Sequence, residues 1–138
     1  MRIEFRTEPE YCDLPDGRTR RLLNDVVVLI DGQHLVIPAG FLTDGASVPR
    51  GMWNLFPPFG PYNKASLLHD FLYQTGRMNR AKITRSQADN IFLAAMVALD
   101  VSAWQRLTMY AGVRVGAWRA WGCYRDADIY REAWGLER

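Results

Sequence analysis

The chain contains the stretch NKASLLHDFLYQTG at residues 63–76, where apolar side chains recur at helical spacing. One row of this expected helix, at positions i, i+3 and i+7, holds Ala65, Leu68 and Leu72. His69 and Tyr73 lie one turn apart in the neighbouring row, so they share a face. The pattern stops at Gly76. The stretch therefore predicts a helix over residues 63–74 that presents a histidine and a tyrosine together.

Two further helices are expected after this one, and each begins with a capping-box sequence. TRSQ at residues 84–87 and SAWQ at residues 102–105 both place a hydroxyl residue three positions before a glutamine. In a capping box the hydroxyl accepts from the third backbone amide of the helix, and the glutamine side chain returns to the cap. These signals predict helices over residues 84–99 and 102–121.

The first 42 residues predict a small antiparallel sheet of three or four strands. Ile3 and Phe5 alternate with charged neighbours, and residues 21–30 include a β-branched run. Asp31-Gly32 is typical of a hairpin turn before the strand expected at residues 34–37.

Between residues 43 and 62 the composition changes to glycine, proline and aromatic residues. Its prolines exclude a helix, and its aromatic residues are too apolar for a free linker, so a long ordered loop is expected. A length of 138 residues, 49% of them hydrophobic, suits one core. We therefore expect a single α+β domain over residues 1–138: a sheet at 1–42, the loop at 43–62 and a three-helix body at 63–138.

Composition excludes several classes of protein. A net charge of +2 from 17 basic and 15 acidic residues is too balanced for a nucleic-acid-binding surface. Cys12 and Cys123 cannot form a disulfide framework or a zinc knuckle, which favours a reducing compartment. The N-terminus lacks the apolar region of a signal peptide, and no stretch reaches the roughly 18 apolar residues of a membrane span.

The second expected helix carries Asp89 at the edge of its apolar stripe, in register with Phe92 and Met96. An unpaired buried carboxylate is costly, so Asp89 needs a partner. His69 on the preceding helix is the natural candidate. A histidine–aspartate pair fixes the imidazole tautomer and raises the basicity of its other nitrogen, as general-base activation of water requires.

A divalent-cation site is expected beside this pair. Asp70 is rotated by about 100° from His69 around the helix and therefore faces a different neighbour. Together with Asp44 and Gly45 of the upstream loop it offers carboxylate and backbone carbonyl oxygens, the ligands that calcium prefers.

Each of these residues also has an ordinary structural interpretation. A lone histidine on an apolar helix face is usually a satisfied core residue, Asp-Gly is usually a turn, and Tyr73 could be ordinary packing. Some other enzyme classes are poorer fits. His34 is the only histidine besides His69, which is too few for a zincin or an HD-type phosphohydrolase, and Ser47 lacks a nucleophile-elbow pattern.

HDFLY at residues 69–73 and DNIF at residues 89–92 resemble the two catalytic helices of calcium-dependent phospholipases of the A-two type, especially small bacterial ones. TDGAS at residues 43–47 lies where the calcium loop of that group is found. The resemblance implies that His69 activates water for attack on an ester and that Asp89 orients His69. It further implies that Tyr73 supports this network and that Asp70 binds calcium with loop oxygens.

A longer pattern, from FLTDGASVPR at residues 41–50 through HDFLY to Phe92, resembles more closely an uncharacterised family encoded by tailed phages and prophages. Two functions are therefore expected as alternatives. One is a calcium-dependent hydrolase of a lipid or another ester. The other is a non-catalytic phage structural or host-interaction protein that keeps a phospholipase-like core. Either would act in the cytoplasm of a bacterial host or in a virion. The expected partner is a lipid or another ester substrate, or else a virion or host protein.

Overall fold

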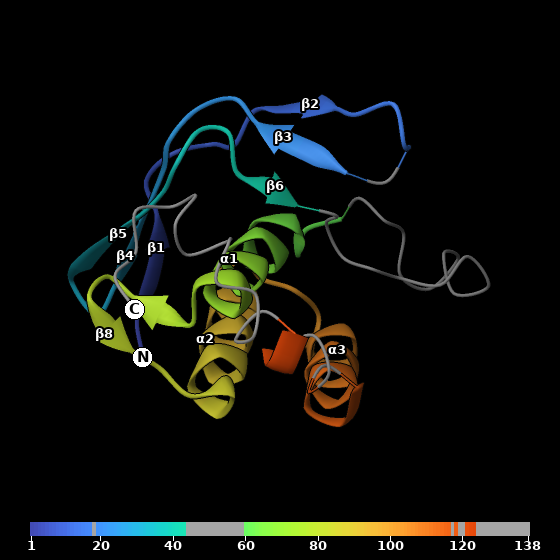
Figure 1. The fold of residues 1–138 in the computed structure, drawn as a ribbon. Coiled ribbons are helices and arrows are strands. Elements are labelled where there is room, and N and C mark those ends of the chain that lie inside the picture. Colours follow the sequence, from blue (N-terminus) through green and yellow to red (C-terminus); the bar gives the residue numbers. More distant parts are fainter. Residues whose placement is uncertain (18, 44–59, 117, 119–120, 124–138) are drawn as a thin grey trace.

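A computed structural model describes residues 1–17, 19–43, 60–116, 118 and 121–123 of the chain. Strands fill its N-terminal part and helices its second half, so the predicted α+β class is confirmed (Figure 1). The strands of the N-terminal part are β1 (Ile3–Phe5), β2 (Tyr11–Asp13), β3 (Arg20–Leu22), β4 (Val26–Ile30), β5 (Gln33–Ile37) and β6 (Leu42–Thr43). They are followed by α1 (Asn63–Thr75), β7 (Arg77–Met78), β8 (Ala81–Lys82), α2 (Arg85–Ala98) and α3 (Ala103–Gly116).

The N-terminal strands form two antiparallel three-stranded sheets, with strand orders β1-β4-β5 and β2-β3-β6, where a single small sheet was predicted. The run at residues 21–30 is divided between them, because two polar side chains bind other segments where β3 ends. Asn24 accepts from the backbone amide of Glu10 at 2.9 Å, and Asp25 accepts from that of Ala39 at 2.8 Å. Hydrogen bonds between side chain and backbone of this kind compete with the backbone hydrogen bonds that would continue one strand through residues 21–30.

The β4–β5 hairpin has the predicted turn. Asp31 and Gly32 take positive φ angles of 49° and 82°, as a tight two-residue hairpin requires. Along β4, the alternate residues Val26, Val28 and Ile30 are buried, so one face of this sheet supplies the core.

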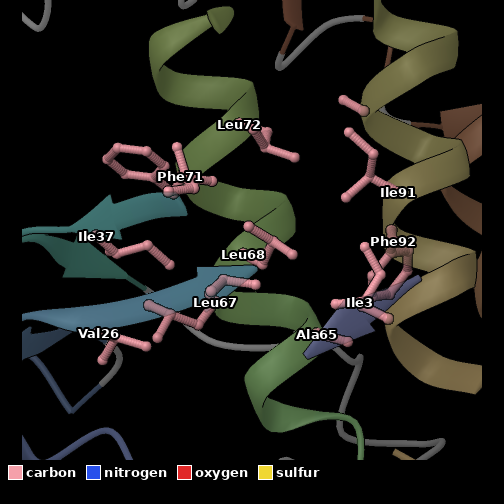
Figure 2. Close-up of a cluster of buried hydrophobic side chains, with 14 of the residues drawn as sticks. Ile3, Val26, Ile37, Ala65, Leu67, Leu68, Phe71, Leu72, Ile91 and Phe92 are labelled. Carbon is pink, nitrogen blue, oxygen red and sulfur yellow. The ribbon is translucent and has the colours of Figure 1, made fainter. Parts of the chain in front are cut away.

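Helix α1 lies between this sheet and α2, and both of its sides are apolar. Figure 2 shows Leu67 and Phe71 on the side of the strands, and Leu68 and Leu72 on the side of α2. Like most residues of α1, all four are buried. The helix ends where the sequence predicted, because Gly76 adopts the left-handed conformation at φ 64° and its amide closes on the carbonyl of Leu72.

The β7–β8 hairpin between α1 and α2 was not predicted. Its strands have two residues each and pair antiparallel, Arg77 with Lys82 and Met78 with Ala81. The hairpin returns the chain so that α2 packs along α1. The capping box predicted for α2 is confirmed: the Thr84 hydroxyl accepts from the amide of Gln87, and the Gln87 side chain accepts from the amide of Thr84.

Helix α3 packs on α2 and has no buried residue. Its start agrees with the prediction, and the Ser102 hydroxyl donates to the Gln105 side chain at 3.1 Å. Helical conformation is also found at Trp118 and at residues 121–123. Among the residues described, no helix combines the length and the apolar character needed to cross a membrane.

Candidate functional site

Asp89 of α2 lies at the centre of a polar cluster inside the helical part of the protein. Its side chain has no exposed surface. One carboxylate oxygen, Oδ1, is 2.8 Å from His69 Nε2 and accepts from the Tyr73 hydroxyl at 2.6 Å. The one-turn spacing of His69 and Tyr73 on α1 brings both donors to the same atom. The predicted contact between His69 and Asp89 is confirmed.

Two aromatic rings pack against the imidazole of His69. The centroid of the His69 ring lies 4.2 Å from that of Tyr73 and 4.5 Å from that of Phe92. Tyr73 in turn makes an edge contact with Trp121 at 5.1 Å. Because 12% of the His69 side chain remains exposed, the ring is oriented by packing and still reaches the surface.

The tautomer of His69 follows from the charge of Asp89. Burial raises the pKa of Asp89, but hydrogen bonds from His69, Tyr73 and Arg114 outweigh burial and hold that pKa below its ordinary value. An ionised carboxylate only accepts hydrogen bonds, so His69 Nε2 carries the proton. Whenever the ring is neutral, Nδ1 holds the lone pair, and it makes no hydrogen bond with any described residue.

Tyr73 remains a neutral donor to this cluster. Burial raises the pKa of its hydroxyl first, and the hydrogen bond to Asp89 and the negative charge of that carboxylate raise it further, whereas Arg85 lowers it. The proton therefore stays on the tyrosine oxygen, which directs it at Asp89.

Two arginines that the sequence analysis did not identify complete the cluster. Arg114 of α3 donates to the other carboxylate oxygen, Oδ2, at 2.8 Å. Arg85, one turn before Asp89, lies 3.7 Å from the same oxygen. Arg85 also donates to the carbonyls of Val113 and Arg114, at 3.0 and 3.2 Å. The spacing of Arg85 and Asp89 could have been recognised in the sequence, whereas nothing local pointed to Arg114.

Asp89 consequently joins three helices. Side chains from α1, α2 and α3 converge on its carboxylate. The guanidinium of Arg85 also binds backbone carbonyls near the C-terminal end of α3, where a positive charge is favourable. The cluster can therefore orient His69 and, by the same contacts, hold the helices together.

Asp70 points away from this cluster, as predicted, and lies near β6. The Gln74 side chain donates to Asp70 Oδ1 at 3.4 Å and to the carbonyl of Leu42 at 3.1 Å. The chain continues from β6 into Asp44 and Gly45, the other predicted cation ligands, but these two lie outside the described residues. Within the described ranges, no three His, Cys, Asp or Glu side chains are grouped so that they could hold a metal ion.

Fold and site together define an α+β protein in which a histidine at the surface, a buried aspartate and a buried tyrosine form a network between two helices. Comparison with known families shows that the chain belongs to the family described as "Protein of unknown function (DUF1353)", whose profile matches residues 21–113. The matched range includes His69, Tyr73 and Asp89 and ends one residue before Arg114.

Among curated proteins, an uncharacterized protein of Sinorhizobium fredii, y4jT, is 34% identical to this chain over 85 residues. The similar region is 60% of this chain but only 24% of y4jT, so this chain resembles about a quarter of that relative. No solved structure is significantly similar to the chain.

Proposed function

We propose that this protein is a hydrolase that cleaves an ester, with His69 as the general base and Asp89 as the residue that orients it. The observation that carries the proposal is the 2.8 Å contact of His69 Nε2 with a fully buried, ionised Asp89. This contact leaves the lone pair on Nδ1 of a partly exposed ring, the arrangement that general-base catalysis needs.

The proposed reaction needs one water molecule and these side chains. Nδ1 of His69 takes a proton from water while the water oxygen attacks the ester carbonyl carbon. The Asp89 carboxylate stabilises the imidazolium that forms, and Tyr73 and Arg114 hold that carboxylate in place. The imidazolium then returns the proton to the alkoxide as the ester bond breaks.

The cation part of the proposal is centred on Asp70. The carboxylate lies on α1 beside the end of β6, where Gln74 ties the helix to the Leu42 carbonyl. The next residues in the chain, Asp44 and Gly45, would supply further oxygen ligands, and oxygen-only ligands suit calcium. When bound, calcium would polarise the ester carbonyl.

Calcium is expected to raise the melting temperature of the wild-type protein, because an ion that binds only the folded state stabilises it by mass action. With Asp70→Asn the shift should be much smaller. Differential scanning calorimetry with and without millimolar calcium measures both, and Asp25→Asn, on the β3–β4 connection, is a matched control that should keep the full shift. Equal shifts for wild-type protein and Asp70→Asn would exclude Asp70 as a ligand.

Hydrolysis by the wild-type protein is the direct test of the proposed function. We expect turnover of phospholipid vesicles or simple carboxylic esters in the presence of calcium and its loss with chelator. Release of acid, followed by titration at constant pH, detects any ester without a chromogenic group. Absence of turnover over both kinds of substrate would remove the support for an enzyme.

A second function is favoured by the two arginines. Arg114 and Arg85 place fixed positive charge against Asp89 and bridge α2 to α3, which is what a purely structural cluster needs. In this second proposed function the cluster is structural, and the protein is a phage-encoded structural or host-interaction protein that acts in a virion or in the host cytoplasm. Its His69 variants would then lose stability and have no activity to lose.

A further inference from the structure

A cavity of about 290 Å³ lies between β5, the C-terminal half of α1 and the β7–β8 hairpin. Its volume is roughly twice that of an apolar cavity of about 150 Å³ that holds one benzene molecule. The residues that line it include Leu35 and Pro38 from β5 and its end, Phe71 and Thr75 from α1, and Arg77 and Asn79 from the hairpin. The space between these elements is therefore large enough for a small organic ligand.

This cavity and the candidate site are on different sides of α1. Phe71 follows His69 by two positions, which separates the two side chains by about 160° around the helix axis. Figure 2 shows Phe71 on the side of the strands, whereas His69 contacts Asp89 of α2. A ligand in the cavity would touch neither His69 nor Asp89, so an inference about it is independent of the proposed hydrolysis.

The walls of the cavity are largely apolar, and two of its polar side chains are used by the fold. Leu35 and Phe71 are buried. The Thr75 hydroxyl donates to the carbonyl of Phe71 at 2.9 Å. Asn79 donates to the carbonyl of His34 at 2.9 Å, which ties the hairpin to β5 beside it (Figure 1). These walls suit an apolar group, because the burial of apolar surface drives its binding.

Arg77 is the charged side chain among the residues that line the cavity. Its Nη1 donates to the carbonyl of Arg80 at 2.8 Å. The other two guanidinium nitrogens, Nε and Nη2, make no hydrogen bond or ion pair with any described residue. These two nitrogens form one side of a planar fork, which matches the two oxygens of a carboxylate. Arg77 can therefore bind an anion at the cavity.

The hairpin adds positive charge around this guanidinium. Arg80 and Lys82 are exposed in the same hairpin. The chain contains no acidic residue between Asp70 and Asp89. Like charges gathered in one place raise the local potential and attract an ion of opposite charge. The surroundings of Arg77 on its own element therefore favour an anionic ligand.

The C-terminal end of α1 works only weakly against an anion. The last carbonyls of a helix carry partial negative charge when they have no donors. Here the Thr75 hydroxyl donates to the carbonyl of Phe71, and the Gly76 amide donates to that of Leu72 at 2.8 Å. The full charge of Arg77 therefore outweighs the partial charges of these satisfied carbonyls.

We propose that this cavity binds a carboxylic acid with a short apolar chain, a class of ligand that octanoate represents. The chain lies against Leu35 and Phe71, and the carboxylate accepts a forked pair of hydrogen bonds from Nε and Nη2 of Arg77. One guanidinium matches one monoanion in charge. An amine with the same chain would instead be repelled by Arg77.

Isothermal titration calorimetry of the whole protein with octanoate at neutral pH tests the site. The wild-type protein is expected to bind one octanoate with a Kd below about 1 mM. Arg77→Gln should weaken binding by about tenfold or more, because glutamine has neither the charge nor the fork. Octylamine should show no binding. Acetate, which keeps the carboxylate without the long chain, should bind at least about tenfold more weakly than octanoate.

Arg80→Gln is the matched control. It removes a charge from the same hairpin, but Arg80 does not line the cavity, so the affinity should stay within about twofold of the wild-type value. His69→Gln should also keep the affinity, which separates this cavity from the candidate site. Arg77 is partly exposed, so circular dichroism should show the wild-type fold in its variant.

Absence of octanoate binding to the wild-type protein would overturn the proposal. Equal affinities of the wild-type protein and Arg77→Gln, or equal binding of octanoate and octylamine, would also overturn it. A loss of binding in His69→Gln without a loss in Arg77→Gln would place the ligand at the candidate site instead. Octyl phosphate bound at least about tenfold more tightly than octanoate would reassign the cavity to a phosphate monoester.

Discussion

Replacement of His69 by glutamine is expected to lower the rate of ester hydrolysis by about 10²- to 10⁴-fold, the usual contribution of a general base. Glutamine cannot accept a proton from water, but its amide can still donate to Asp89 Oδ1. The free energy of unfolding should therefore change by only about 1 kcal/mol, the net value of an ordinary hydrogen bond. Initial rates on the ester that the wild-type protein cleaves best, together with urea denaturation, measure the two effects separately.

Tyr73→Phe is the matched control for this variant. It removes the other donor to the same carboxylate oxygen and leaves the imidazole in place. A positioning residue of this kind should cost less activity than the base itself. Equal rates for wild-type protein and His69→Gln would contradict the assignment of His69 as the base, whereas equal losses in both variants would show that only the integrity of the network matters.

Asp89→Asn is expected to give the largest loss of stability, about 3–5 kcal/mol, the range found when one partner of a buried ion pair is removed. The NH2 group of asparagine cannot accept a hydrogen bond. It would therefore face either the donors His69 and Tyr73 at the position of Oδ1, or the guanidinium of Arg114 at the position of Oδ2. Urea denaturation at neutral pH measures the loss. A variant as stable as the wild-type protein would show that the cluster contributes little to folding.

The same variant should change how stability depends on pH. The folded protein lowers the pKa of Asp89, so the ionised form contributes stability that is complete above the unfolded value of about 3.9. That contribution is lost as the pH falls through the lower folded value. The difference between wild-type protein and Asp89→Asn should therefore be constant near neutral pH and shrink below about pH 4. A difference that grows on acidification would contradict the direction of the pKa shift.

The helices of this protein were largely predictable from sequence, because their signals are local. The capping box of Thr84 and Gln87 satisfies backbone groups within one turn, and Gly76 ends α1 by a backbone conformation that other residues adopt only with strain. The turn at Asp31-Gly32 belongs to the same class. Such features depend on the nearest neighbours in the chain and not on the rest of the fold.

The arrangement of the strands was less predictable. A run of strand-forming residues shows that strands occur at residues 21–30, but not where one sheet ends and another begins. Asn24 and Asp25 decide that point by binding Glu10 and Ala39, which are 14 residues away from them in each case. The β7–β8 hairpin was missed because strands of two residues are too short to show a periodic pattern.

The sequence by itself determined one half of the candidate site. Helical periodicity placed His69 and Tyr73 on one face, and the cost of an unpaired buried charge required a partner for Asp89. Only the tertiary structure brought Arg114, 25 residues further along the chain, to that carboxylate and set Arg85 against the end of α3. The physical reason is that periodicity fixes where a side chain lies around its own helix, whereas the packing of the helices decides which charges meet.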